Sequence, residues 1–181
     1  MATYTTSFAS VSLFHVTALL LLQHSHSSSH NALVAKVCGN VAKHDFCVDA
    51  LNSDPRTPTA DLPGLGVVAI DLLTHYATTA RTYIGNLKIV EKCGQRQQYL
   101  DICNAYYNEL LGLAGSCYGH LKKKDYGAMT AAANAASSDA YDCEATFVSD
   151  PCQSSPITFV NQSVANLADI VGAVASILAN P

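Results

Sequence analysis

Beyond the first thirty or so residues, apolar and small side chains recur at alternating steps of three and four along four segments of the chain. This spacing places them on one face of an α-helix. Alternation with a period of two, which would indicate strands, is nearly absent. The pattern therefore predicts four amphipathic helices around one core, with stripes formed by Leu65, Ala69, Leu72, Tyr76, Thr79, Tyr83, Leu87 and Val90; Tyr99, Cys103, Tyr106, Leu110, Leu113, Cys117 and Leu121; Tyr126, Met129, Ala133, Ala136, Ala140, Cys143 and Phe147; and Val160, Val164, Leu167, Val171, Val174 and Leu178.

The breaks between these stripes are short. Residues 92–94 (Lys-Cys-Gly) follow the first stripe, and a run of lysines with Asp125, a favourable helix N-cap, separates the second from the third. Ser155 and Pro156 stand at the expected start of the fourth helix. Because short links favour antiparallel neighbours, we expect an all-α, up-down-up-down four-helix bundle over residues 61–179, with crossing angles of about 20°.

The segment ahead of the bundle divides into two parts. No charged residue precedes Lys36, and residues 11–23 form an apolar run that is too short to cross a membrane but typical of a signal peptide. We therefore predict a signal peptide over approximately residues 1–30 and a mature domain over residues 31–181. Within that domain, residues 34–58 are expected to form an N-terminal α-hairpin extension.

Seven cysteines in an exported chain indicate disulfides rather than metal or redox chemistry. If the second and third helices form a hairpin centred near Lys123, then Cys103 and Cys143, twenty positions on either side, face each other. The same antiparallel pairing about Lys123 brings Cys93 close to Cys152. These two pairs are therefore the disulfides predicted for the bundle.

The remaining cysteines are Cys38, Cys47 and Cys117. Cys38 and Cys47 lie close together in the N-terminal segment and are expected to form a local disulfide. Cys117 has no cysteine opposite it and is the expected free thiol, buried as a small hydrophobic side chain. An alternative, in which Cys38, His44 and Cys47 bind a metal, is disfavoured because their spacing lacks the paired pattern of structural zinc sites.

Other features narrow the class of function. No nucleophile, base and orienting group can be named, so the chain is not expected to be an enzyme or to need a cofactor or metal. The formal net charge of −4 argues against a nucleic-acid partner. No apolar run after the predicted signal peptide is long enough to span a membrane without polar interruption. The sequon at Asn161 is a candidate glycosylation site.

Three stretches carry a resemblance to a known family. They are Cys38 and Cys47, which have eight residues between them, the sequence YLDICNAYYNEL over residues 99–110, and KDYGAMTAAANAASSDAYDCEATF over residues 124–147. Together they resemble the plant invertase and pectin methylesterase inhibitor family, and residues 54–66 are most similar to its pollen members. The family fold, an α-hairpin on an antiparallel four-helix bundle, agrees with the fold that the residue pattern predicts.

The resemblance implies a secreted inhibitor that blocks the active-site cleft of a plant acid invertase in a reversible one-to-one complex, in the cell wall or the vacuole. A pectin methylesterase is the alternative target. Invertase-directed members carry a Pro-Lys-Phe motif near the start of the third bundle helix, where this chain has Lys-Asp-Tyr. The residues expected to contact a target enzyme are therefore Lys122, Lys123, Lys124, Asp125 and Tyr126.

Two other interpretations stay open at this stage. Tyr126 also fits the core stripe of the third helix, so it is either an aromatic anchor or a core residue. From a different functional class, the bundle is compatible with a small-ligand carrier or a pollen-coat protein that has no enzyme target. In each case we expect a monomer without a membrane anchor once the signal peptide has been removed.

Overall fold

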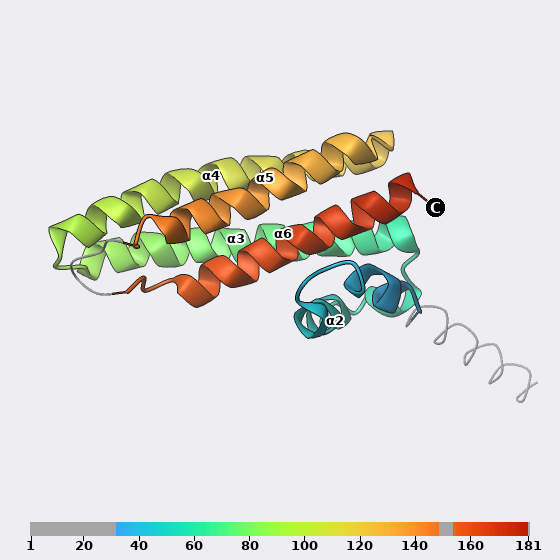
Figure 1. Cartoon of the computed structure of the whole chain (residues 1–181), viewed down its shortest axis with the longest axis horizontal. Helices are drawn as coiled ribbons and strands as arrows, with labels where there is room; N and C mark the ends of the chain where they lie inside the picture. Colours follow the sequence, from blue (N-terminus) through green and yellow to red (C-terminus); the bar gives the residue numbers. More distant parts are fainter. Residues whose placement is uncertain (1–31, 149–153, 181) are drawn as a thin grey trace, which may run out of the picture.

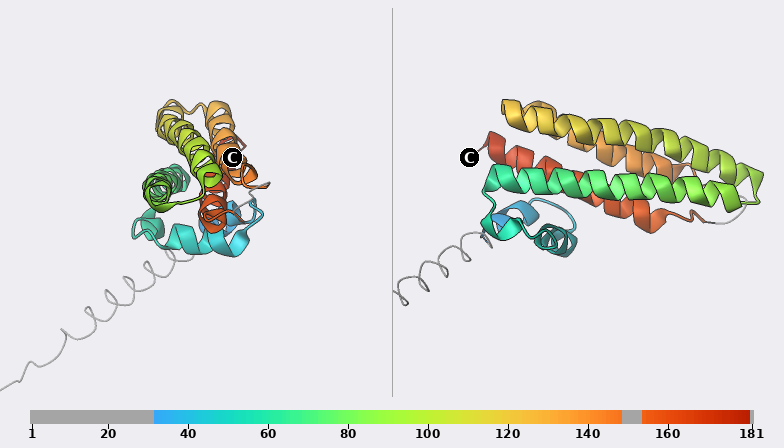
Figure 2. Two further views of the ribbon diagram at one scale, coloured as in Figure 1. Left: turned by 90° about the vertical axis from the view of Figure 1, so that its left-hand side faces the viewer. Right: turned by 180° about the vertical axis from the view of Figure 1, so that it is seen from behind.

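The computed structural model describes residues 32–148 and 154–180. Four long helices make up most of it: α3 (Leu62–Val90), α4 (Gly94–Lys123), α5 (Tyr126–Ala145) and α6 (Thr158–Ala179). Each packs against the next, and α6 also packs against α3, so the four close into a bundle whose helices alternate in direction (Figures 1 and 2). No strand occurs in these two ranges. The predicted all-α antiparallel four-helix bundle is confirmed.

An α-hairpin lies beside one end of the bundle, near the start of α3 and the end of α6 (Figure 1). It consists of helical residues 32–38, helix α2 (His44–Asn52) and the 3₁₀ turn η1 (Thr57–Thr59). A disulfide joins Cys38 to Cys47, with 5.5 Å between their Cα atoms. The predicted hairpin extension and its local disulfide are thus confirmed. The predicted signal peptide lies outside the described residues.

The stripe predicted for the first bundle helix is correct only at its start. Leu65 and Ala69 are buried in α3, but Tyr76 and Tyr83 are 47% and 43% exposed. Past Ile70, the buried side of α3 is formed one position away from that stripe, by Leu73, Ala77, Ala80 and Ile84. The small side chains of the two alanines allow neighbouring helices to approach closely, and the tyrosines face outward instead.

Helix α6 is the most enclosed of the four. It packs against α3, α5 and the hairpin helix α2, and more than half of its 22 residues are buried. Among the described residues it is also the one helix long and apolar enough to cross a membrane, yet 67% of its most apolar window is buried inside the bundle. Its place at the centre of the core explains that composition.

The bundle disulfide joins Cys103 on α4 to Cys143 on α5, with 4.6 Å between their Cα atoms, as the antiparallel pairing of the two helices predicts. Cys117 is a buried free thiol, also as predicted, and burial raises its pKa to about 11. Cys93 is disulfide-bonded. Its predicted partner Cys152 lies outside the described residues, so that pairing stays a prediction.

Beside the bundle disulfide, a buried polar network ties three helices together. The hydroxyl of Tyr107 on α4 donates to Oδ1 of Asn161 at 2.9 Å, and Nδ2 of Asn161 donates to Oε2 of Glu144 at 2.8 Å. Burial, together with the nearby Glu144, raises the pKa of Tyr107. Ser155 and Thr158 donate their hydroxyls to the same carboxylate. Glu144 thereby fixes the start of α6 against α5.

This network overturns the predicted glycosylation site. Asn161 is 1% exposed, and the side-chain nitrogen that would carry a glycan is the one that donates to Glu144. A sugar attached there is incompatible with the folded bundle. The sequon is therefore a chance match that supplies a structural asparagine.

Candidate functional site

The predicted contact residues 122–126 form the tight connection between α4 and α5, which we call the lysine turn. Helix α4 ends at Lys123, and Lys124 adopts the left-handed conformation with φ of 57°. The backbone N–H of Lys124 donates to Leu121 at 3.1 Å, and that of Asp125 donates to His120 at 2.9 Å. These bonds close the helix C-terminus and give the turn a defined shape.

Asp125 begins the next helix. Its carboxylate accepts a hydrogen bond from the backbone N–H of Ala128 at 3.1 Å, which confirms the predicted N-cap of α5. The left-handed residue before it and the cap itself fix the two helices in an antiparallel arrangement. The lysine turn is therefore an ordered projection at the end of the bundle that also carries the α-hairpin (Figure 1).

Charge is the main chemical property of the lysine turn. Lys122, Lys123 and Lys124 are all exposed. Within the described part of the chain, no carboxylate lies within ion-pair distance of any of the three. Their charges are favoured locally by the negative end of the α4 dipole. The turn thus presents three cationic groups to solvent on a chain whose net charge is negative.

Tyr126 is half-buried at the first position of α5, so it is not part of the buried core, and its role as an aromatic anchor stays a prediction. Its carbonyl accepts the hydroxyl proton of Thr130 at 2.9 Å. Next to the turn, a shallow groove of about 450 Å³ runs between α3 and α4 and is lined by Pro63, Gly64, Val67, Tyr118, Leu121 and Lys122. The turn and this groove form one continuous surface through Lys122.

An ion cluster holds the hairpin to this end of the bundle. The guanidinium of Arg56 contacts Asp54 at 2.6 Å within the hairpin and Asp71 on α3 at 2.7 Å. Its hydrogen bonds hold the pKa of Asp54 at about 2, below the ordinary value. The hydroxyl of Tyr118 on α4 also donates to Asp71, so the hairpin, α3 and α4 meet at one carboxylate.

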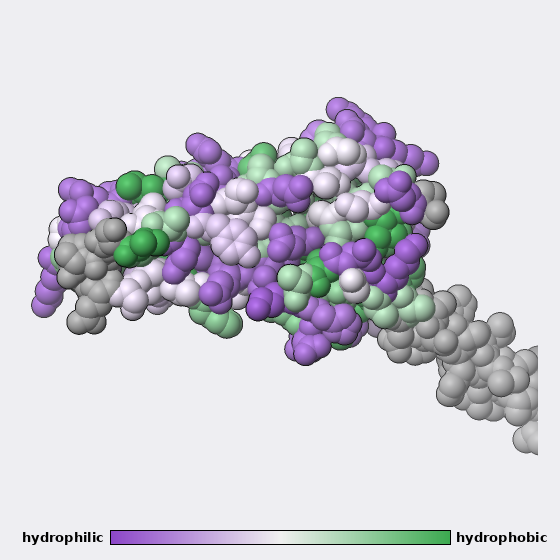
Figure 3. All heavy atoms as spheres, viewed as in Figure 1, coloured by the Kyte–Doolittle hydropathy of each residue, from purple (hydrophilic) through white to green (hydrophobic). Residues whose placement is uncertain are grey.

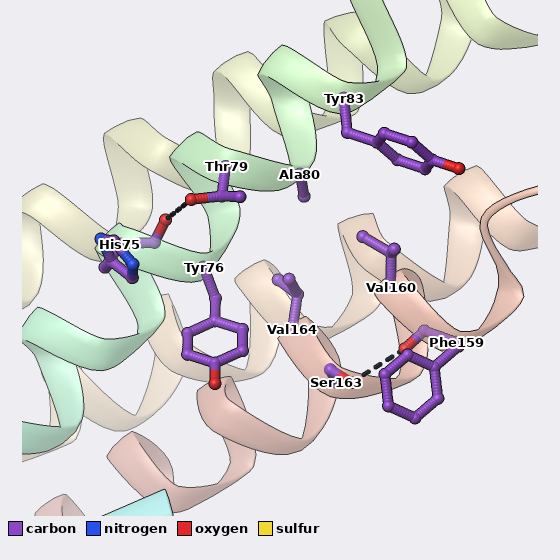
Figure 4. Close-up of a pocket in the computed structure, with 9 residues that line it drawn as sticks. All are labelled: His75, Tyr76, Thr79, Ala80, Tyr83, Phe159, Val160, Ser163 and Val164. Atoms are coloured by element: carbon purple, nitrogen blue, oxygen red, sulfur yellow. Dashed lines mark hydrogen bonds between the residues drawn. The ribbon is translucent and has the colours of Figure 1, made fainter. Parts of the chain in front are cut away.

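A second hollow, of about 480 Å³, lies between α3 and α6 (Figure 4). The sequence pattern does not predict this hollow, because Tyr76 and Tyr83, which line it, belong to the stripe expected to form the core. Elsewhere, on the face drawn in Figure 3, hydrophilic residues cover much of the bundle and strongly hydrophobic ones form small separate patches. No group of His, Cys, Asp and Glu within the described ranges could hold a metal ion. In particular, Cys38 and Cys47 are joined to each other, which excludes the alternative metal site.

Comparisons with known proteins agree with one another. Residues 32–174 match the family model described as plant invertase/pectin methylesterase inhibitor. The chain is 30% identical over 175 residues to the protein named "Putative invertase inhibitor" from Platanus acerifolia, which covers 93% of this chain and 96% of that one. It is 26% identical over 178 residues to "Pectinesterase inhibitor" from Actinidia deliciosa, covering 95% and 96% of the two chains.

A crystal structure of mutant form A of a pectin methylesterase inhibitor from Arabidopsis has a similar fold. The TM-score is 0.72, and the match covers 80% of this chain and 95% of that chain. At 18% identity, this likeness shows the shared helical architecture and nothing about the target.

Proposed function

This chain belongs to the plant invertase/pectin methylesterase inhibitor family, and from that premise we propose that it inhibits an acid invertase through a reversible one-to-one complex centred on the lysine turn. Its relatives are named as inhibitors rather than as catalysts, in agreement with the prediction that the chain is not an enzyme. The observation that carries the proposal is the cluster of three exposed, unpaired lysines on an ordered turn.

Charge complementarity supports the role of these lysines. Glycoside hydrolases cleave their substrates between two carboxyl groups, so the cleft of an invertase presents acidic side chains. A cationic projection is attracted to such a cleft and is oriented on approach. Among the described residues the three lysines have no ion-pair partner to lose, so carboxylates of a target enzyme can pair with them without breaking such a contact.

The same argument favours invertase over pectin methylesterase. Sucrose is uncharged, whereas demethylated homogalacturonan carries a carboxylate on each sugar. An enzyme that binds such a polyanion needs a groove compatible with negative charge, where three clustered lysines would be a poor fit. The names of the relatives do not decide between the two targets, because the Platanus protein is named for invertase and the Actinidia protein for pectinesterase.

The location of the protein is part of the proposal. We propose that the chain is exported after removal of residues 1–30 and acts as a monomer in the cell wall, with the vacuole as an alternative compartment. The two described disulfides support an oxidising compartment. No role in nucleic-acid or membrane binding is proposed.

A matched pair of charge reversals tests the lysine turn. Lys123→Glu alters its centre, and Lys92→Glu makes the same change at an exposed lysine just before α4, a helix of 30 residues and so about 45 Å long. Each variant is titrated against an acid invertase at acidic pH. We expect Lys123→Glu to raise the inhibition constant about tenfold or more, the effect of about 1.4 kcal/mol of lost interface energy, and Lys92→Glu to leave it within about twofold.

Two results would contradict the assignment. Equal weakening by both reversals would mean that only the overall charge matters and that the turn is not the contact. Full inhibition by Lys123→Glu would place the contact elsewhere on the bundle. Circular dichroism of each variant provides the folding control.

A further inference from the structure

We propose that the groove between α3 and α6 is a binding site for a small, uncharged, planar aromatic molecule. The site is separate from the lysine turn, so the proposal goes beyond enzyme inhibition. It rests on the shape, the lining and the boundaries of the groove.

Aromatic side chains from two helices line the groove (Figure 4). Tyr76 and Tyr83 project from α3, and Phe159 from α6, while Val160 and Val164 form the apolar floor. The hollow measures about 480 Å³, within the range of about 300–1,000 Å³ that is usual for small-molecule sites. Its size is therefore that of a ligand rather than of a single trapped water.

The length of the groove sets the size of its ligand. Tyr76 and Tyr83 are seven residues apart on one helix, which separates them by two turns, or about 10 Å along the axis. The rings of His75 and Tyr76 are nearly perpendicular, with centroids 5.9 Å apart. A flat molecule of two or three fused rings spans the space between the tyrosines and can contact both.

The polar groups of the groove explain why the ligand should be uncharged. Among the residues that the structure describes, no Asp, Glu, Lys or Arg lines it, so a charged molecule would lose hydration without gaining a carboxylate, ammonium or guanidinium partner. The hydroxyls of Thr79 and Ser163 donate to the carbonyls of His75 and Phe159, at 3.0 and 2.9 Å. For a sugar, the described lining then offers the hydroxyls of Tyr76 and Tyr83 and the imidazole of His75, fewer groups than the several donors and acceptors that its ring hydroxyls need.

The surroundings argue against a protein as the occupant. Neighbouring exposed positions of α3 are polar, namely Thr78, Arg81 and Thr82, and Arg81 is already bound to Asn108 at 2.8 Å. The apolar surface therefore stops at the edges of the hollow. A stable protein interface buries about 800 Å² on each partner, far more than a groove of this width offers. Large exposed aromatics around a bounded hollow favour a small ligand.

The test is a titration of the mature, disulfide-bonded protein with Nile red, a neutral fused-ring dye whose emission rises in apolar sites. We expect saturable binding of one dye per chain. Tyr76→Ala with Tyr83→Ala should weaken it about tenfold or more, because two ring contacts are removed. Tyr76→Phe with Tyr83→Phe should keep the affinity within about threefold, since the rings remain.

The control variant is Tyr141→Ala, which removes a tyrosine of matched exposure, 50%, from α5. It should bind the dye like the wild type, and the double alanine variant should still inhibit its target enzyme. The proposal is overturned if Nile red does not saturate, if Tyr141→Ala weakens it as strongly as the double variant, or if the double variant loses enzyme inhibition with its dye binding. The last result would make the groove part of the enzyme contact.

Discussion

The α-hairpin and the four-helix bundle are held together in different ways. In the bundle, a continuous apolar core, the disulfide between Cys103 and Cys143 and the network around Asn161 are all buried. The hairpin contributes few buried side chains to that core, and its link to α3 through Arg56 is an exposed ion cluster. The bundle is therefore stabilised mainly by packing, and the hairpin by a smaller packed surface that includes Val37 and Leu51, together with its disulfide and its ion cluster.

This difference has a consequence for function. The lysine turn belongs to the bundle, since α4 and α5 define it from both sides. The hairpin lies at the same end but contacts α3 and α6. The local stability of the lysine turn should thus follow that of the bundle and be insensitive to changes confined to the hairpin.

Removal of the disulfides should give the largest effects and should separate the two regions. The bundle disulfide spans 40 residues and the hairpin disulfide 9. Chain entropy then predicts a loss of about 4 kcal/mol of unfolding free energy for Cys103→Ala with Cys143→Ala, and about 2.5 kcal/mol for Cys38→Ala with Cys47→Ala. Urea denaturation measures both, and hydrogen exchange shows where protection is lost.

We expect the hairpin variant, Cys38→Ala with Cys47→Ala, to lose hydrogen-exchange protection within residues 32–52, while α4 and α5 keep theirs. If the hairpin variant instead opened the whole bundle, the two regions would form one cooperative unit and the comparison would fail. An unchanged unfolding free energy in the bundle variant would contradict the structural importance of the Cys103–Cys143 link.

The polar network should give an intermediate effect that is confined to the bundle. Asn161→Ala removes one of the donors to Glu144 and the acceptor of the Tyr107 hydroxyl, which leaves that buried hydroxyl unpaired. We expect a loss of about 2–3 kcal/mol in urea denaturation. Asn166→Ala, at a part-exposed position of the same helix, is the matched control and should cost less than about 1 kcal/mol. Equal losses would show that the network contributes nothing specific.

A change of pH should give the smallest effect, and again only in the bundle. Burial raises the pKa of Asp139 on α5 to about 6, and the negative charges of Glu109 and Asp142 add to the shift. A carboxyl whose pKa is higher in the folded state binds more protons there, so folding becomes more favourable as the pH falls from 6 to 4. In the hairpin, Asp54 has a pKa of about 2 and stays ionised over this window.

Asp139→Asn should therefore raise the unfolding free energy at pH 7, by less than about 1 kcal/mol because the group is partly solvated, and this gain should vanish near pH 4. Asp49→Asn, at an exposed position of α2, is the control and should change the pH profile little. Thermal unfolding at a series of pH values is the measurement. A gain that is constant with pH would assign the effect to something other than the Asp139 charge.

Much of the fold could be predicted because it depends on local patterns. Stripes of apolar residues and short links determine an antiparallel bundle, and the mirror symmetry of a helical hairpin then places Cys103 opposite Cys143. The cap at Asp125 depends only on its immediate neighbours. Each of these features can be inferred without knowing how distant parts of the chain pack.

The incorrect predictions concern features that are determined by packing between segments far apart in the sequence. Leu72 and Leu73 both continue a helical stripe from Ala69, and the predicted stripe follows Leu72 to Tyr76 and Tyr83. Close packing of α3 against its neighbours instead buries the alanines one position away. The burial of Asn161 likewise depends on Tyr107, 54 residues earlier. Neither relation leaves a local signal in the sequence.

The most direct test of the proposed function is a parallel inhibition titration. The oxidised protein, residues 31–181, is added at acidic pH to a plant acid invertase and, separately, to a plant pectin methylesterase. We predict loss of invertase activity at close to one inhibitor per enzyme, with pectin methylesterase activity unchanged. Inhibition of pectin methylesterase alone, or of neither enzyme, would contradict the proposal that the lysine turn is directed at an invertase.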